Sequence, residues 1–218
     1  MMELTTRSVW GCAMIIGLLA LSSPTGQAED ARQPAGRVHD AASVPVSLLP
    51  TEGLSGSFKQ RIEDTQGNLL SESRGQFALR KPHFFRWSIQ APGQQLLVAD
   101  GRWLWQYDLD LETVSRQPME LDGNAPLRLL TQSLANLEGD YSLQWNENVL
   151  TLTPLNPNPA FQAMGVHYDN GVPQRLTIDD SLGQTVDILF VVDAKGVPPL
   201  STFEFEPPAD IDVYTQEP

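Results

Sequence analysis

Three histidines are the first candidates for chemistry in this sequence. His39, His83 and His167 are far apart, and none has another histidine two or four residues away. Zinc sites usually combine histidines at such spacings with cysteines or carboxylates. We therefore interpret these histidines as residues of exposed strands or loops, and we predict no metal site.

Two short segments carry residue types that catalytic or cation sites use. Asp108, Asp110 and Glu112 alternate along the chain as they would in a cation loop, but the glycine and the distal glutamate of an EF-hand are missing. Residues 53–57 read Gly-Leu-Ser-Gly-Ser, which is the wrong order for the nucleophile elbow of a serine hydrolase. We therefore expect an acidic hairpin loop at 108–112, no cofactor and no enzymatic activity.

The balance of acidic and basic residues limits which classes of molecule the protein could bind. The 218 residues include 14 Lys and Arg against 27 Asp and Glu, which gives a net charge of −13. A nucleic-acid binder needs a basic stripe for phosphate contacts, so this balance argues against nucleic acid. The same excess of acid argues against peripheral docking on an anionic membrane surface.

The first 28 residues have the features of a secretory signal peptide. Arg7 precedes an apolar run over residues 9–21, and the small residues Gly26 and Ala28 stand where a leader is cleaved. The run is shorter than an ordinary membrane-spanning helix. We therefore expect export and removal of residues 1–28.

The only cysteine, Cys12, lies within this leader. A lipidation cysteine follows the apolar run, whereas Cys12 is near its start, so we expect an exported protein without a lipid anchor or a disulfide. Residues 29–42 contain proline and glycine and have no hydrophobic period, which predicts a flexible extension. Residues 43–218 are predicted to form a single domain.

Most of this domain has the alternating pattern of β-strands. Tight-turn signals such as Asp100-Gly101 and Asn170-Gly171 separate the apolar and polar alternations. The predicted strands cover residues 54–62, 69–79, 84–90, 95–100, 102–107, 113–117, 141–145, 149–153, 161–168, 176–178 and 186–192.

One central segment has a helical pattern instead. Leu127, Leu130 and Leu134 recur at helical spacing after Pro126, which suits a first helical turn. A second, short helix is predicted over residues 43–49. Many short antiparallel strands with two helical insertions predict a closed or partly closed β-barrel, with helical material over its mouth.

Large apolar side chains recur on successive predicted strands. They could all point to one side of the sheet, where they would form either an ordinary packed core or the wall of a ligand cavity. The residues concerned are Phe58, Phe77, Phe85, Trp87, Leu97 and Trp105.

The segments that carry these residues resemble one protein family. Residues 81–87 read Lys-Pro-His-Phe-Phe-Arg-Trp, and residues 96–108 read LLVADGRWLWQYD. Together with residues 54–60, 124–127 and 203–213, they are similar to the outer-membrane lipoprotein carrier family (LolA) of Gram-negative bacteria. The resemblance implies a mainly β fold, an unclosed antiparallel β-barrel of about 10 to 11 strands with short α-helices covering a hydrophobic cavity.

The same resemblance implies a function. A carrier of this family accepts acylated lipoproteins released by an inner-membrane ABC transporter, shields their acyl chains in the cavity and passes them to an outer-membrane receptor. It implies a soluble, monomeric protein of the periplasm. Phe58, Phe77, Trp87, Leu97 and Trp105 would line the acyl-chain cavity, and Leu127, Leu130 and Leu134 would belong to the lid.

One position departs from the family pattern. The family has an arginine before the proline of residues 81–82, and this arginine bonds to lid carbonyl groups in the closed form. Here the position holds Lys81, which offers a point charge in place of a planar fork. Lys81 would be the lid latch with carbonyl groups near Leu130 and Thr131, while Arg80 has the opposite strand parity. Phe85 matches an aromatic residue linked to transporter contacts, so it would serve partner docking in place of the cavity.

Two other functions share the fold. An outer-membrane lipoprotein receptor would need an acylated cysteine, and acylation of Cys12 would favour it. A lipid or lipoprotein sensor with a similar barrel would need a further partner-binding domain.

Overall fold

The structure is a computed structural model that describes residues 52–119, 137, 139–157, 161–194 and 196–215. Its elements, in chain order, are β1 (Gly53–Glu63), β2 (Leu69–Arg80), β3 (Phe84–Ala91), β4 (Gln95–Asp100), β5 (Trp103–Asp108), β6 (Thr113–Pro118), β7 (Tyr141–Asn146), β8 (Val149–Pro154), β9 (Phe161–Asp169), β10 (Val172–Asp180), β11 (Thr185–Ala194), the short 3₁₀ helix η4 (Leu200–Phe203) and β12 (Val213–Thr215).

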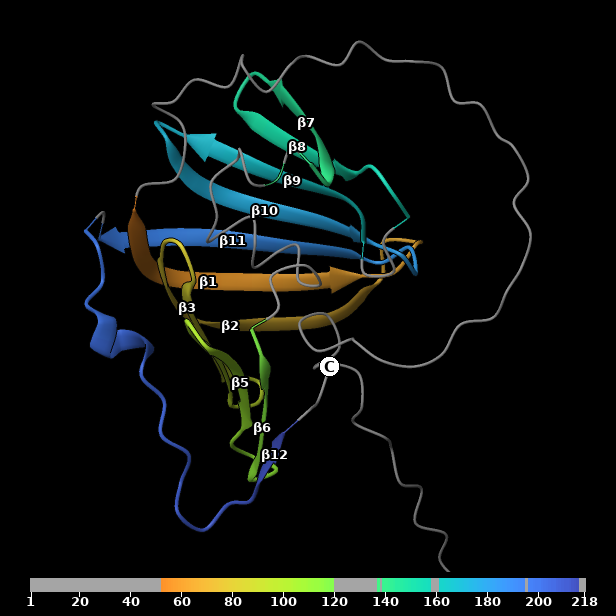
Figure 1. Cartoon of the computed structure of the whole chain (residues 1–218). Helices are drawn as coiled ribbons and strands as arrows, with labels where there is room; N and C mark the ends of the chain where they lie inside the picture. Colours follow the sequence, from red (N-terminus) through yellow and green to blue (C-terminus); the bar gives the residue numbers. More distant parts are fainter. Residues whose placement is uncertain (1–51, 120–136, 138, 158–160, 195, 216–218) are drawn as a thin grey trace, which may run out of the picture.

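All twelve described strands belong to one sheet. Their spatial order is β12-β6-β5-β4-β3-β2-β1-β11-β10-β9-β8-β7. Neighbouring strands are antiparallel except for β12, which pairs with β6 in parallel. In Figure 1, β1, β2, β10 and β11 lie across the view and β5, β6 and β12 run down it, so the sheet coils strongly. Within the described residues β7 and β12 are the two edges, and the sheet is not closed.

The first hairpin illustrates why these segments become strands. Buried and exposed residues alternate along β1 and β2, as a sheet with one apolar face requires. The turn between them is fixed by Asp64, whose Oδ1 accepts hydrogen bonds from the backbone N–H groups of Gln66 (2.8 Å) and Asn68 (2.9 Å). Gly67 has a φ of +80°, a conformation that glycine adopts at no steric cost.

The buried apolar side chains form two clusters on opposite faces of the sheet. The inner cluster draws residues from β1 to β5 and from β7 to β11. The outer cluster centres on Leu96, Val98, Trp105 and Val114. Strand β4 contributes Leu97 and Ala99 to the first and Leu96 and Val98 to the second, which explains its unbroken apolar run. Since the inner cluster joins β7, at one edge of the sheet, with strands as far across it as β5, the sheet curls around it.

The carboxyl-terminal segment covers the outer cluster. The ring of Phe205 lies 5.5 Å from that of Trp105 and 6.0 Å from that of Tyr107. Arg80 donates a hydrogen bond from Nη1 to the carbonyl of Pro198 (3.1 Å), and Arg86 donates one to the carbonyl of Thr202 (3.4 Å). This segment therefore closes the outer face, and Arg80 is bound to it.

The predicted fold is confirmed in its main feature and incomplete in detail. Each of the eleven predicted strands is present, with bounds that differ by a few residues. The sequence patterns missed η4 and β12. Several predicted features lie outside the described residues and stay predictions: the helices at 43–49 and around Leu127, the leader, and the extension at 29–42. The boundary of the single domain also stays a prediction.

Candidate functional site

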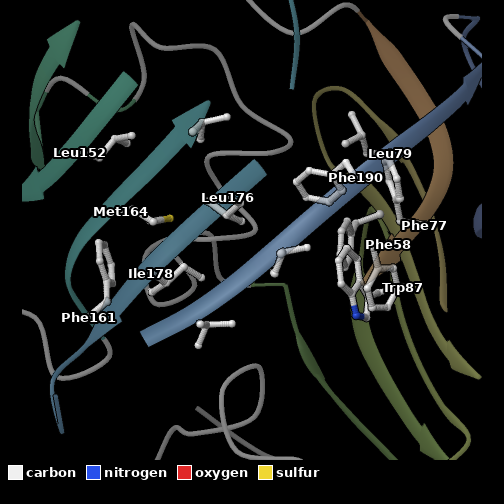
Figure 2. Close-up of a cluster of buried hydrophobic side chains, with 14 of the residues drawn as sticks. Phe58, Phe77, Leu79, Trp87, Leu152, Phe161, Met164, Leu176, Ile178 and Phe190 are labelled. Carbon is white, nitrogen blue, oxygen red and sulfur yellow. The ribbon is translucent and has the colours of Figure 1, made fainter. Parts of the chain in front are cut away.

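One part of the inner cluster is aromatic. Phe58 of β1 stacks on Trp87 of β3 with 3.6 Å between ring centroids, and Phe190 of β11 meets Phe77 at 5.1 Å and Trp87 at 6.3 Å. Phe85 lies 5.8 Å from Trp87. Figure 2 shows the rings of Phe58, Phe77, Trp87 and Phe190 packed together. We call these five residues the aromatic half of the inner cluster.

A glycine makes this stacking sterically feasible. Phe58 and Trp87 lie on strands that are separated by β2, where Gly75 is the residue directly opposite Phe58. A Cβ atom at Gly75 would overlap the backbone oxygen of Ser88 on β3 and stand 2.9 Å from Cε1 of Phe58, both closer than real Cβ atoms approach. The missing side chain therefore lets the Phe58 ring cross β2 and reach Trp87.

The rest of the inner cluster is dominated by aliphatic side chains. On β9, Phe161 and Tyr168 stand near the two ends of the strand, with Met164 and Val166 between them. Figure 2 shows this group opposite the aromatic rings, with β11 between. We call the following residues the aliphatic half: Leu150, Leu152, Met164, Val166, Leu176 and Ile178, each at most 3% exposed.

The structure brings together four of the five residues predicted to line the cavity. Phe58, Phe77, Trp87 and Leu97 all belong to the inner cluster. Trp105 belongs to the outer cluster, so the prediction that it shares a face with the other four is wrong. The reason is register: Trp105 pairs with Val98, which points away from Leu97, and its Nε1 donates to Oδ2 of Asp100 (2.8 Å).

Phe85 and Phe190 also differ from the sequence-based assignments. Phe85 is only 4% exposed and lies in the inner cluster, so in this conformation its ring is part of the packed interior and has little surface for a partner. Phe190 was missed as a cluster residue, although the alternation of Val186, Ile188, Phe190 and Val192 could have indicated it.

Two buried polar atoms on the inner face of β2 and β3 have no hydrogen-bond partner among the described residues. They are Nε1 of Trp87 and Oγ of Ser73, and these residues are 3% and 5% exposed. Gln60, directly opposite Ser73 on β1, is 7% exposed. Buried polar groups are normally paired, so this side of the cluster has unused hydrogen-bonding capacity.

The acidic loop is a hairpin turn, as expected. Oδ1 of Asp108 accepts hydrogen bonds from the N–H groups of Asp110 (3.1 Å) and Leu111 (3.0 Å), and Oδ2 of Asp110 accepts one from Gln94 (3.0 Å). Its carboxylates therefore stabilise the backbone turn. Across the residues that the structure describes, no group of three or more His, Cys, Asp or Glu side chains is arranged to hold a metal ion.

The inner face is a packed apolar cluster, and comparison with known proteins places the chain in a family. Residues 50–206 match the family described as "Outer membrane lipoprotein carrier protein LolA". The chain belongs to this family. An outer-membrane lipoprotein carrier protein of Halorhodospira halophila is 37% identical over 169 residues, which are 77% of this chain and 81% of that protein.

Further members of the LolA family are similar over comparable or longer stretches. The carrier protein of Pseudomonas fluorescens is 30% identical over 210 residues, covering 93% of this chain and 98% of its own. Among solved structures, a LolA superfamily protein from Nitrosomonas europaea has 16% identity and a TM-score of 0.43, covering 72% of this chain and 92% of its own. Within the described residues, no helix is long and apolar enough to cross a membrane.

Lys81, the predicted lid latch, follows β2 directly and is half-buried. Its backbone N–H donates to the carbonyl of Glu52 (2.9 Å). Burial lowers the pKa of the Lys81 ammonium group, and the charge of Glu52 partly offsets this shift. The ammonium group is therefore partly desolvated and lies within the field of a carboxylate.

The predicted lid residues Leu127, Leu130 and Leu134 lie outside the described residues. The nearest described residues on either side are Met119 and Leu137, and both pack against the inner cluster. Leu137 is fully buried there. The chain thus leaves and re-enters the described structure at the inner face.

Proposed function

We propose that this protein carries lipoproteins across the periplasm. It would accept acylated lipoproteins that an inner-membrane ABC transporter releases, hold their acyl chains against the inner cluster and pass them to an outer-membrane receptor. The observation that carries the proposal is the continuous apolar inner face of a chain that belongs to the LolA family. It would act as a binding protein and without enzymatic chemistry.

The physical need for such a face is large. Transfer of each acyl CH₂ group out of water is favourable by about 0.8 kcal/mol of free energy. Acyl chains that stay exposed to water would therefore aggregate or return to a membrane. An inner face built from Leu, Met, Ile, Phe and Trp side chains offers an apolar surface of matching chemistry. A periplasmic carrier with this surface would keep the lipoprotein soluble during transfer.

Release requires that the affinity stay moderate. The inner cluster is already packed with its own side chains, so an acyl chain would replace existing contacts and gain only the difference. Transfer to a receptor is then possible because the empty protein regains its internal packing. Opening would also uncover Phe85, which could then meet a partner as the family resemblance implies.

We assign the lid to the segment between Met119 and Leu137. Its leucines 127, 130 and 134 would face the inner cluster in the empty form, and Lys81 would hold carbonyl groups near Leu130 and Thr131. The packing of Met119 and Leu137 on the cluster and the partial burial of Lys81 support this assignment. A lysine latch has fewer simultaneous partners than arginine, so closure would be weaker.

Mass spectrometry of the purified periplasmic protein tests the carrier role. The chain would be co-expressed with a triacylated lipoprotein and its inner-membrane release machinery. We expect a mature protein that starts near Glu29, carries no lipid of its own and binds one lipoprotein. An empty protein under these conditions would contradict the proposal, and acylation of Cys12 would identify a receptor.

Lys81→Leu tests the latch by a transfer assay. The loss of the ammonium group should weaken the closed, empty form. Because release of the lipoprotein regenerates that form, the variant should still bind lipoprotein but release it more slowly to receptor-containing membranes. Lys59→Leu is the matched control, because Lys59 is exposed on the face of β1 that points away from the inner cluster. Equal transfer by both variants would remove Lys81 from the mechanism.

A further inference from the structure

Trp87 has a buried hydrogen-bond donor for which the described part of the chain supplies no acceptor. The indole ring is 3% exposed, and its Nε1 is unpaired among the residues that the structure describes. By contrast, Nε1 of Trp105, in the outer cluster, donates to Asp100 at 2.8 Å. In Figure 2 the indole nitrogen of Trp87 lies at the end of the ring that points away from Phe190.

A tryptophan at this position is costly for packing alone. Its ring contacts are with Phe58, Phe77, Phe85 and Phe190, none of which can accept a conventional hydrogen bond. Burial without an acceptor forfeits the hydrogen bond that the N–H group makes with water in the unfolded chain. A trapped water would need two or more polar partners, and these rings supply none.

The polar atoms of this half lie in neighbouring rows of the sheet. Trp87 stacks on Phe58, which stands opposite Gly75. The next inward-facing row along the same two strands is Gln60 with Ser73. The buried Oγ of Ser73 also has no partner in the described part of the chain. The aromatic half and the adjoining row thus present an indole N–H, a hydroxyl and an amide on one face of the sheet.

We propose that Trp87 is a specificity-determining residue that donates its Nε1–H to an ester carbonyl oxygen of the bound acyl group. Ser73 and Gln60 would meet the other polar atoms of the glyceryl ester linkage, while the hydrocarbon chains extend over the aliphatic half. This inference rests on the proposed carrier function and deepens it. The carrier then recognises ester-linked acyl groups in addition to their hydrophobicity.

A pair of matched lipopeptides tests this assignment. One has a dipalmitoylglyceryl group on its amino-terminal cysteine, and the other has the dihexadecyl ether analogue, which lacks both carbonyl oxygens. The full mature protein should bind the ester more tightly than the ether. In Trp87→Phe, affinity for the ester should fall about three- to tenfold, the effect of one buried hydrogen bond, and affinity for the ether should change less than about twofold.

Two controls separate the hydrogen bond from packing. Trp145→Phe removes a partly buried indole that packs against the same cluster, and it should affect both lipids equally. In wild-type protein labelled with ¹⁵N, the Nε1–H proton resonance of Trp87 should move downfield with the ester and not with the ether. The resonance of Trp105, already hydrogen-bonded, is the internal reference.

The outcomes distinguish the two proposals. If wild-type protein binds neither lipopeptide, the carrier function fails. If it binds both with equal affinity, and the Trp87 resonance responds identically to each, the carrier function stands and the role of Trp87 is overturned. If Trp87→Phe loses affinity for both lipids alike, its ring serves packing alone and the proposed hydrogen bond is wrong.

Discussion

The two halves of the inner cluster differ in how they are built. In the aromatic half, rings from four strands contact one another, the closest at 3.6 Å. Two buried polar atoms on the same side have no partner within the described ranges. In the aliphatic half, side chains such as Leu152, Met164 and Leu176 fill the space, and Figure 2 shows them opposite the rings. Stacked rings have few alternative arrangements, whereas Met and Leu adapt their rotamers more easily.

This difference indicates that the two halves of the inner cluster serve different purposes. A flexible aliphatic wall can separate and repack around hydrocarbon chains of varied length without a specific geometry. A rigid aromatic wall holds a polar group in a defined position, as recognition of a carbonyl requires. We therefore expect the aliphatic half to open for cargo and the aromatic half to keep its shape.

The largest expected effect is the loss of a ring from the aromatic half. Phe58→Ala should lower the free energy of unfolding by about 3–5 kcal/mol, because the stacked neighbours cannot close the cavity. Leu176→Ala, at an equally buried position, should cost about 2–3 kcal/mol, since Met164 on the adjacent strand can move into the space. Urea denaturation of both variants measures the difference. A larger loss of unfolding free energy for Leu176→Ala than for Phe58→Ala would contradict the view that the aliphatic half adapts more easily than the aromatic half.

A smaller effect is expected where the backbone makes room for the ring. Gly75→Ala places a Cβ atom against Phe58 and the backbone of Ser88, so it should cost about 1–3 kcal/mol through overpacking. Gly139→Ala is the control, because a Cβ atom there has nothing within 4 Å. Denaturation measures stability, and near-ultraviolet circular dichroism reports the Phe58–Trp87 stack. An unchanged spectrum with unchanged stability would show that the stack does not depend on Gly75.

The division into halves could be predicted from the sequence only in part. Alternation along 54–62 and 69–79 predicts which residues of each strand share a face, and Phe58, Phe77 and Trp87 do lie together. Strand β4 is apolar on both faces, so its pattern does not indicate which side is concave, and Trp105 was assigned to the wrong side. The register between strands, which is not encoded in the period of any one strand, decides this.

The short terminal elements illustrate a second limit. β12 has three residues, and its alternation is too brief to distinguish it from a loop. What fixes it is pairing with β6 and the packing of Ile211 and Val213 on the outer cluster, contacts between segments nearly a hundred residues apart. The unpaired Trp87 nitrogen is likewise visible only once its neighbours on four strands are known.

The smallest expected effect concerns a phenol beside the aliphatic half. Burial raises the pKa of Tyr168 well above its ordinary value of 10. The unfolded chain therefore loses this proton first, and stability that is fully present below pH 10 should fall above it, by at most about 1.4 kcal/mol per pH unit. Tyr168→Phe removes this titration, so its stability should fall less steeply between pH 10 and 11 while differing little at pH 7.

The reference variant for this comparison is Tyr214→Phe, because Tyr214 is 63% exposed. The ammonium group of Lys81 changes the stability in the opposite direction. Its pKa is lowered in the folded protein, so the free energy of unfolding rises with pH below 10.5. Wild type and both tyrosine variants share this contribution, so it cancels in the comparison. The aromatic half contains only Phe and Trp side chains, so alkaline pH should loosen the cluster first around Tyr168 and its neighbour Trp145. If the stability of Tyr168→Phe and of wild type depends on pH in the same way, the phenol stays solvated in the folded protein. Alkaline pH would then give no reason to expect the aliphatic half to open more easily than the aromatic half.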